Sequence, residues 1–189
     1  MATAYYCAMS LDGYIAEADD TIDWLLSYEG TFAGEGAASG ERPYERFFET
    51  VGALVMGSTT YAFIVDELDD GGRWPYGNKP TWVLSSRDLP GPGDDEADVR
   101  IVDGRVRDLH DEMVAAAGGR RLWIVGGGNV ASQFADEGLL HELIVTVVPV
   151  VLGEGKPLFD RRLPGGSMRL TGVRPLDTGM VELAYELPR

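Results

Sequence analysis

The strongest constraint on the fold is a pattern that occurs three times, in which a short apolar run ends in glycine, serine or threonine. The three copies lie at residues 55–59, 83–87 and 124–128. Short apolar runs bounded by turn residues are typical of strands that are buried on both faces. Helical patterns follow the first and third runs, and strands that alternate with helices predict a mostly parallel sheet. Because ligands bind beyond the carboxyl ends of such strands, we expect the three turns to line one crevice.

The two ends of the chain supply further strands. Residues 3–9 have the composition of a buried first strand, which residues 14–16 extend beyond a turn at Asp12-Gly13. Near the other end, residues 167–173 and 180–187 are two strand candidates joined by a short turn. A late pair of this kind predicts an antiparallel C-terminal edge on the sheet.

Helical periodicity is clearest over residues 106–117, where apolar residues share one face and acidic residues the other. Gly118-Gly119 is expected to stop this helix. A second helix is expected to begin at Pro43 and to bury a face that includes Phe47 and Val51. The chain is therefore predicted to form an α/β fold.

Length and composition limit the class of protein. A chain of 189 residues has the size of one domain, so we expect residues 1–189 to form a single domain. The formal net charge of −15 opposes the counterion release on which nucleic-acid binding depends. Residues 4–9 form an apolar stretch too short for a signal peptide or a membrane span. We expect a cytoplasmic protein without nucleic-acid or membrane partners.

Metal and disulfide chemistry are not expected. Cys7 is the only cysteine, and His110 and His141 are the only histidines. These numbers exclude a disulfide scaffold and the usual zinc-site spacings.

The triple glycine at residues 126–128 is the strongest candidate binding motif. Glycine lets the backbone approach a diphosphate closely, and the free N–H groups at the start of the following helix attract an anion. The alternative is that the glycines only relieve crowding in the turn. At the neighbouring turn, the hydroxyls of Ser85 and Ser86 and the guanidinium of Arg87 suit a 2′-phosphate, which favours NADP over NAD. An ordinary exposed surface arginine is the alternative there.

The order of the motifs identifies a family that the chain resembles. Five motifs occur in sequence: 8–16 (AMSLDGYIA), 53–57 (ALVMG), 84–87 (LSSR), 125–128 (VGGG) and 149–159 (PVVLGEGKPLF). Together they resemble the C-terminal reductase domain of the bifunctional riboflavin-biosynthesis deaminase/reductase and, more distantly, dihydrofolate reductase. The resemblance covers nearly the whole chain. It implies a dihydrofolate-reductase-like three-layer fold, with a mostly parallel central sheet, an antiparallel C-terminal edge and helices on both faces.

The resemblance also implies which residues bind the cofactor, NADPH. Ala8 and Ile15 correspond to positions that flank the nicotinamide. Two turns correspond to the diphosphate cradle, namely Gly57, Ser58, Thr59 and Thr60, and Val125, Gly126, Gly127, Gly128, Asn129 and Val130. Ser85, Ser86 and Arg87 correspond to the adenosine-phosphate contact, and Gln133 is expected to join from the helix. Ser58 stands where dihydrofolate reductases usually carry a basic residue.

The substrate side is expected to involve residues from several segments. Glu41 or Glu45 is the candidate for the carboxylate that aids protonation in dihydrofolate reductase, although glutamate is also common at helix starts because of the helix dipole. The candidate substrate contacts are Asp12, Trp24, Phe48, Thr146 and Lys156. Tight-turn geometry would equally explain Asp12, core packing would explain Trp24, and solvent exposure would explain Lys156.

The leading functional hypothesis is an NADPH-dependent reductase resembling 5-amino-6-(5-phosphoribosylamino)uracil reductase. Its substrate would be a small molecule, phosphorylated if the resemblance extends to the substrate, and a homodimer is what the family implies. Dihydrofolate reductase or another small-heterocycle reductase is the second hypothesis. The third is an NADP(H)-binding module without turnover.

Overall fold

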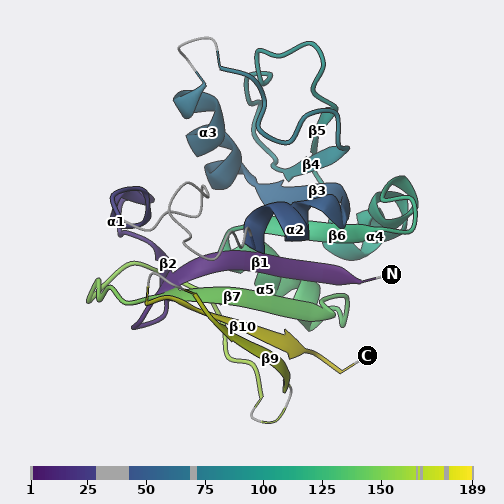
Figure 1. The fold of residues 1–189 in the computed structure, drawn as a ribbon. Helices are drawn as coiled ribbons and strands as arrows, with labels where there is room; N and C mark the ends of the chain where they lie inside the picture. Colours follow the sequence, from purple (N-terminus) through teal and green to yellow (C-terminus); the bar gives the residue numbers. More distant parts are fainter. Residues whose placement is uncertain are drawn as a thin grey trace.

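The computed structural model describes residues 2–28, 43–68, 72–164, 166, 168–176 and 179–188. Its centre is an eight-stranded sheet in the order β5-β4-β3-β6-β1-β7-β10-β9 (Figure 1). The strands of this sheet are β1 (Thr3–Ser10), β3 (Val51–Gly57), β4 (Thr81–Leu84), β5 (Val99–Val102), β6 (Arg121–Gly126), β7 (Glu142–Val148), β9 (Arg169–Pro175) and β10 (Val181–Glu186).

The strand directions confirm the expected mixture. All pairings among β1, β3, β4, β5, β6 and β7 are parallel. β10 runs antiparallel to both β7 and β9, which makes the C-terminal edge antiparallel. The carboxyl ends of the six parallel strands therefore meet at one edge of the sheet.

One strand expectation is wrong. β2 (Tyr14–Ala16) does not extend β1 but pairs with β8 (Lys156–Pro157) in a separate two-stranded sheet. The reason is a tight turn after β1, in which the Gly13 amide donates to the Ser10 carbonyl at 3.0 Å. Gly13 has φ of 94°, a conformation that glycine adopts without strain.

Helices cover both faces of the sheet and give three layers. Alternate residues of β3 show this, because Ala53 and Val55 belong to one core cluster and Leu54 and Met56 to another. The first cluster includes residues of α4 (Val106–Ala116) and α5 (Gly128–Asp136). The second includes residues of α2 (Pro43–Glu49) and α3 (Ser58–Glu67). A short helix, α1 (Asp23–Leu26), lies near the carboxyl end of β1 (Figure 1).

The boundaries of two helices can be compared with those expected from helical periodicity. α4 confirms the helix expected from residue 106, and positive φ values of 58° at Gly118 and 87° at Gly119 end it. The helix that begins at Pro43 is shorter than expected, since it ends at Glu49 and Val51 is the first residue of β3. Val51 pairs with Arg121 in the parallel sheet, and this pairing outweighs the helical spacing.

The connections leave the sheet in opposite directions at its centre. β3 leads through α3 to β4 on one side, whereas the adjacent β6 leads through α5 to β7 on the other side. Such a reversal is a topological switch point, where ligands of open α/β sheets bind. The sequence order of the strands alone does not reveal which pair of turns lies at this point.

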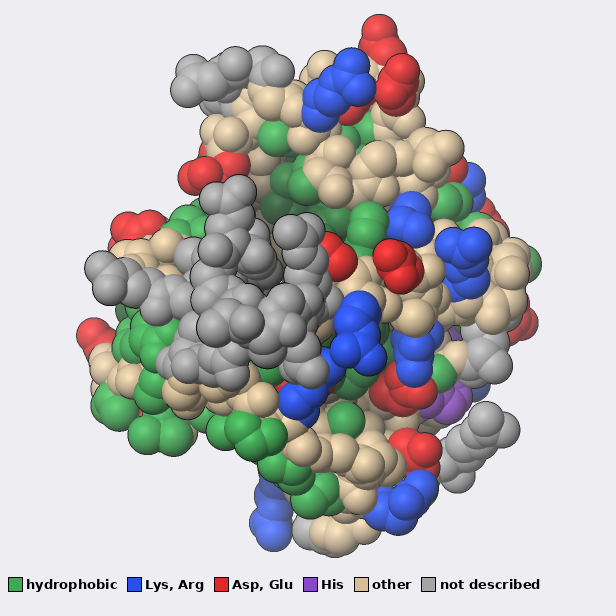
Figure 2. Space-filling view, viewed as in Figure 1, with side chains coloured by type: hydrophobic (Ala, Val, Ile, Leu, Met, Phe, Trp, Pro, Cys, Tyr) green, Lys and Arg blue, Asp and Glu red, His purple; other side chains and the backbone are tan. Residues whose placement is uncertain are grey.

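The described helices and one face of the surface were compared with the features of membrane spans and basic patches. No described helix is long and apolar enough to cross a membrane. Figure 2 shows the Lys and Arg side chains of one face interspersed with Asp and Glu, rather than gathered in one continuous basic patch.

His110 supplies a pH-dependent contribution to stability. Its Nε2 lies 3.0 Å from Oγ1 of Thr3, at the start of β1. Burial lowers the pKa of His110 below 6.5; Asp111 opposes this, and His141 and Arg107 add to it. A lowered folded pKa means that the unfolded chain binds the proton first, so stability is full above pH 6.5 and falls as the pH drops through the folded pKa.

We therefore expect the melting temperature to be lower at about pH 5.5 than at about pH 7.5, with the loss below pH 6.5, and the difference to be smaller in His110→Gln. Carboxyl groups with lowered pKa values, such as Asp12 and Asp94, titrate below this window, because their ordinary value is 3.8. Differential scanning calorimetry across the range measures the effect. An equal fall in both proteins would contradict the assignment to His110.

Candidate functional site

Two helices begin at the switch point without a side-chain cap. Gly57 precedes α3 and Gly127 precedes α5, and neither helix has a side-chain cap hydrogen bond. The first N–H groups of a helix have no partner within the helix and carry the positive end of its dipole. The site therefore presents two uncapped helix starts from adjacent strands.

The two turns contact each other. A Cβ atom placed on Gly57 would lie 3.3 Å from a methyl carbon of Val130 in α5. A Cβ atom on Gly126 would lie 3.1 Å from Oγ1 of Thr60 in α3. The ends of β3 and β6 are thus interlocked, which fixes the two helix starts relative to each other.

The three consecutive glycines have different surroundings. A Cβ atom on Gly128 would lie 2.5 Å from the carbonyl oxygen of Pro157, too close for any side chain. Gly126 is also tightly packed, whereas a Cβ atom on Gly127 would meet nothing within 4 Å. Two glycines therefore relieve crowding, and the middle one leaves open space in front of the α5 start. Crowding therefore explains Gly126 and Gly128, and the diphosphate prediction remains a prediction for the turn at Gly127.

A cation from the next turn reaches the start of α3. The Arg87 guanidinium donates to Oγ of Ser58 at 2.6 Å, across the ends of β3 and β4. The turn itself is held by Ser85, whose Oγ accepts from the Arg87 amide at 3.0 Å. Ser58 stands where dihydrofolate reductases usually carry a basic residue, and the Arg87 guanidinium brings a positive charge to this place. Ser86 and Thr59 are exposed beside it.

Asn129 and Gln133 both form side-chain hydrogen bonds, and Asn129 contacts another segment. The Asn129 amide donates to Asp160 at 2.5 Å and accepts from Gln133 at 2.8 Å. Burial raises the pKa of Asp160, but hydrogen bonds from Arg161, Ser132 and Asn129 outweigh it and lower the pKa to about 2. The Asn129 contact ties the segment after β8 to α5, and Gln133 supports Asn129 from within the helix.

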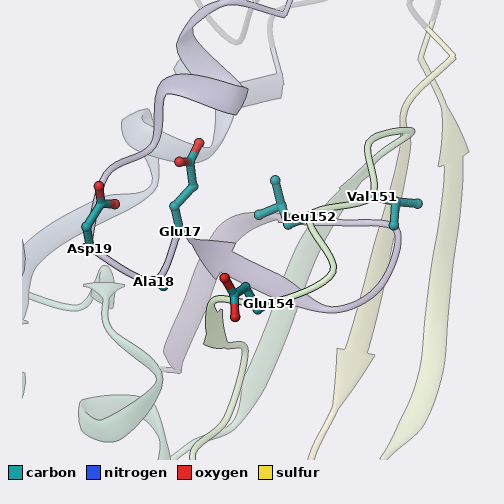
Figure 3. Close-up of a pocket in the computed structure, with 6 residues that line it drawn as sticks. All are labelled: Glu17, Ala18, Asp19, Val151, Leu152 and Glu154. Atoms are coloured by element: carbon teal, nitrogen blue, oxygen red, sulfur yellow. The ribbon is translucent and has the colours of Figure 1, made fainter.

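An acidic cavity lies elsewhere in the molecule. It has a volume of about 400 Å³, and Figure 3 shows its lining of Glu17, Ala18, Asp19, Val151, Leu152 and Glu154. None of the predicted site residues lines it. Three carboxylate side chains repel a phosphorylated cofactor, so the uncapped helix starts are the better candidate for an anionic ligand.

Some of the residues predicted to contact the nicotinamide or the substrate lie near the carboxyl half of β1. Ala8 is buried on β1 and pairs with Thr146 of β7. Trp24 of α1 is buried in a cluster with Ala8. Ile15 is half-buried in β2.

Asp12 and Lys156 are occupied by other contacts. The Asp12 carboxylate accepts from the Ser10 hydroxyl at 2.6 Å and from the amide of Gly153 at 2.7 Å. It also accepts from the Leu152 amide at 3.2 Å, so it ties the turn after β1 to the segment after β7. Lys156 pairs with Asp20 at 3.4 Å. The geometry favours a structural role for Asp12.

Phe48, a predicted substrate contact on α2, lies apart from the glycine turns. Phe48 lies under Lys79, whose Nζ is 4.8 Å from the ring centroid and donates to the carbonyl of Val51. Because Val51 begins β3, Phe48 is placed toward the amino edge of the sheet, away from the glycine turns. Glu45 is half-buried in the first turn of α2. Glu41 lies outside the described residues.

Comparison with known proteins identifies the family. Residues 74–182, more than half of the chain, match the model of the RibD C-terminal domain. The chain belongs to the RibD C-terminal domain family. The resemblance inferred from the ordered motifs is confirmed.

Individual relatives cover the chain to different extents. The uncharacterized protein YwjB of Bacillus subtilis (strain 168) is 33% identical, with 97% of this chain and 96% of YwjB covered. A crystal structure described as a riboflavin biosynthesis protein from Shewanella sp. PV-4 is 31% identical, with a TM-score of 0.81 and both chains covered completely. The riboflavin biosynthesis protein RibD of Corynebacterium ammoniagenes is 28% identical over 78% of this chain, which spans only 43% of that protein.

More distant structures support the fold. The Thermotoga maritima structure, named as a diaminohydroxyphosphoribosylaminopyrimidine deaminase and 5-amino-6-(5-phosphoribosylamino)uracil reductase, is 17% identical with a TM-score of 0.63. It covers 99% of this chain, which spans 56% of that structure. The three-layer fold of this RibD C-terminal domain therefore agrees with that of bifunctional relatives.

Tyr6 is a polar residue that motif analysis does not single out. Its side chain lies on the same face of β1 as Ala8, because strand residues two apart share a face. Its hydroxyl is buried, and the Thr146 hydroxyl lies close enough to lower its pKa, although the two do not meet the geometry of a hydrogen bond. The sequence gives little sign of a special role for Tyr6, because tyrosine is common in buried strands.

Proposed function

We propose that this protein is an NADPH-dependent reductase that acts on a small substrate. The observation that carries the proposal is the pair of uncapped helix starts at the switch point, with open space at Gly127. This geometry fits a diphosphate, because the main-chain N–H groups can approach it without hindrance from a side chain. Membership of the RibD C-terminal domain family supports the same conclusion.

The chain's own residues would divide the binding of the cofactor among them. The amides that follow Gly57 and Gly127 would hold the diphosphate, and Arg87 would pair with the 2′-phosphate. Ala8 of β1 and Ile15 of β2 would flank the nicotinamide ring. When bound, NADPH supplies a hydride to the substrate. The protein contributes position and electrostatics.

For the substrate we propose 5-amino-6-(5-phosphoribosylamino)uracil, the compound in the printed name of the Thermotoga relative. The buried polar groups beside Ala8 support a substrate position on the β1–β7 part of the sheet. Glu45, on the first turn of α2, is the described candidate for a carboxylate that assists protonation.

Titration of the purified protein with NADPH and NADH tests the proposal, with fluorescence of the nicotinamide as the signal. We expect NADPH to bind at micromolar concentrations or below, and its absorbance to fall when the aminouracil compound is added. Failure to bind either nucleotide would refute the cofactor assignment. Oxidation with dihydrofolate but not with the aminouracil compound would identify a different reductase.

Arg87 provides a sharper test of cofactor preference. Replacing it with Gln removes the cation beside Ser58 but keeps a hydrogen-bond donor. We expect the preference for NADPH over NADH to fall roughly tenfold, because a charge-assisted bond to phosphate contributes about 1.5–3 kcal/mol and Gln retains part of it. Dissociation constants for both nucleotides measure the change. Arg105→Gln is the control, since Arg105 pairs with Asp108 in α4, and it should leave the ratio unchanged.

A further inference from the structure

Lys79 carries a half-buried amine that the proposed function does not use. The chain has two lysines, Lys79 and Lys156. The Nζ atom of Lys79 donates to the carbonyl of Val51, the first residue of β3, at 2.8 Å. β3 extends from Val51 to Gly57, which is about 20 Å at roughly 3.3 Å per residue. Lys79 therefore lies at the amino edge of the sheet, remote from the glycine turns at the carboxyl edge.

The surroundings hold the Lys79 side chain and backbone in place. Nζ lies 4.8 Å from the centroid of the Phe48 ring, so an aromatic face covers one side of the amine. The Lys79 amide donates to the Tyr76 carbonyl at 3.4 Å, and the Lys79 carbonyl accepts from the Thr81 hydroxyl at 3.0 Å. A reagent that arrives from solvent therefore meets the amine in a fixed arrangement.

A second cation lies beside this amine. Arg121 pairs with Val51 in the parallel sheet, so its neighbour Arg120 lies next to the carbonyl that Lys79 binds. The Arg120 side chain is exposed. Burial lowers the pKa of Lys79 most, Arg120 lowers it further, and no described carboxylate opposes these two effects. A lowered pKa increases the share of neutral amine near neutral pH, and the neutral amine is the nucleophile.

Lys156 has the opposite surroundings. Its Nζ atom pairs with the Asp20 carboxylate at 3.4 Å. The acidic cavity lies nearby, since Glu154 is two residues away in the chain and Asp19 interacts electrostatically with Lys156. Carboxylates around an amine repel an anionic reagent. The two lysines of this chain thus differ in the charge of their neighbours.

We propose that Lys79 is a modification site whose amine is acylated by an acyl phosphate. The ammonium group first releases a proton to water, while Arg120 attracts the phosphate end of the reagent. The neutral amine attacks the acyl carbon and forms a C–N bond. The C–O bond to phosphate breaks, and phosphate leaves with the bonding electron pair and takes a second proton from the amine nitrogen. No group is oxidised or reduced.

Acylation removes the positive charge of Lys79 but leaves one N–H on the side chain. This N–H can still donate to the carbonyl of Val51, so we expect the modified chain to stay folded. The site is separate from the turns at Gly57 and Gly127 and does not depend on a bound nucleotide. Failure of the proposed function would therefore leave this proposal unaffected.

The experiment uses the full chain, with acetyl phosphate as the probe. Peptide mass spectrometry after cleavage at arginine follows acetylation of Lys79 and Lys156 in the same sample over time. We expect the initial rate at Lys79 to exceed that at Lys156 about fivefold, which corresponds to about 1 kcal/mol, the attraction between unit charges about 4 Å apart in water. Equal rates, or a faster rate at Lys156, would overturn the proposal.

Arg120→Gln separates this arrangement from the ordinary exposure of a lysine. We expect acetylation of Lys79 to slow about fivefold in this variant, because the cation that attracts the probe is removed, whereas Lys156 keeps the parent's rate. The melting temperature should not change, since Arg120 is exposed. Arg105→Gln is the control, because Arg105 pairs with Asp108 and should affect neither rate. An unchanged rate at Lys79 in folded Arg120→Gln would refute the role of Arg120 and with it the proposal.

A neutral reagent tests whether the phosphate of the probe matters. N-acetoxysuccinimide transfers the same acetyl group but carries no charge. We expect Arg120→Gln to slow its reaction with Lys79 less than it slows the reaction with acetyl phosphate, because the attraction between charges is absent. Equal slowing with both reagents would mean that Arg120 acts only on the amine, and it would exclude the selection of an acyl phosphate.

Discussion

A Gly127→Asp variant is expected to bind NADPH about 100-fold more weakly than the parent protein while remaining folded. The substitution places a carboxylate in the open space before α5, where a Cβ atom meets nothing within 4 Å. The Gly127 φ of −14° lies outside the left-handed region, so a side chain there adds no left-handed strain. Repulsion between this carboxylate and a diphosphate about 4 Å away is of the order of 4 kcal/mol in a partly exposed site, and a loss of about 2.7 kcal/mol corresponds to 100-fold.

Two companion variants separate charge from bulk. Gly127→Asn has nearly the same size as Gly127→Asp but no charge, and we expect a loss of affinity of only a few-fold. Gly127→Ala should bind almost as well as the parent. Fluorescence titration gives the affinities, and thermal melting verifies that all three variants fold. A folded Gly127→Asp protein with the parent's affinity would remove the diphosphate from this turn and with it the proposed function.

At the next residue, Gly128→Ala is expected to destabilise the fold by about 2 kcal/mol. A Cβ atom there would lie 2.5 Å from the carbonyl oxygen of Pro157 and 2.9 Å from that of Leu158. Both contacts are with backbone atoms, so α5 and the β8 segment must move apart, and overpacking of this kind costs about 1–3 kcal/mol. In a chain of this length the melting temperature should fall by about 4–8 °C.

The contrast between the neighbouring variants tests the division of roles in the triple glycine. Gly128→Ala should lose stability, and Gly127→Ala should lose neither stability nor affinity to a comparable extent. Calorimetric unfolding of the two proteins under the same conditions provides the comparison. Equal stability of Gly128→Ala and the parent chain would mean that the close approach of α5 to Pro157 does not constrain the fold.

Much of the architecture follows from local patterns. The apolar runs at residues 55–59, 83–87 and 124–128 predicted parallel strands, and the spacing over 106–117 predicted α4; both are confirmed. These predictions succeed because a strand buried on both faces and an amphipathic helix each leave a mark in consecutive residues. The prediction that residues 14–16 extend β1 failed because the partner of β2 lies at residues 156–157, far along the chain.

The predictions for the site residues show the same difference between local patterns and contacts with distant segments. The turns that contain Gly57 and Gly126 were predicted to line one crevice with the turn at Arg87, and the structure brings the first two into contact. The engagement of Asn129 with Asp160, and of Asp12 with the amides of Leu152 and Gly153, depends on segments distant in sequence. No local pattern records such a contact, and cofactor binding by Asn129 was predicted from the family resemblance alone.

The amino-acid sequence by itself determined the family, the α/β class, the strand–turn–helix units and the glycine and arginine residues of the candidate cofactor site. Each of these depends on residues that are close together in the chain. Only the tertiary structure decided that the β3 and β6 turns lie at the switch point, that Arg87 reaches Ser58, and that Gly127 alone among the three glycines faces open space. The physical reason is that strand order and side-chain burial arise from packing between distant segments.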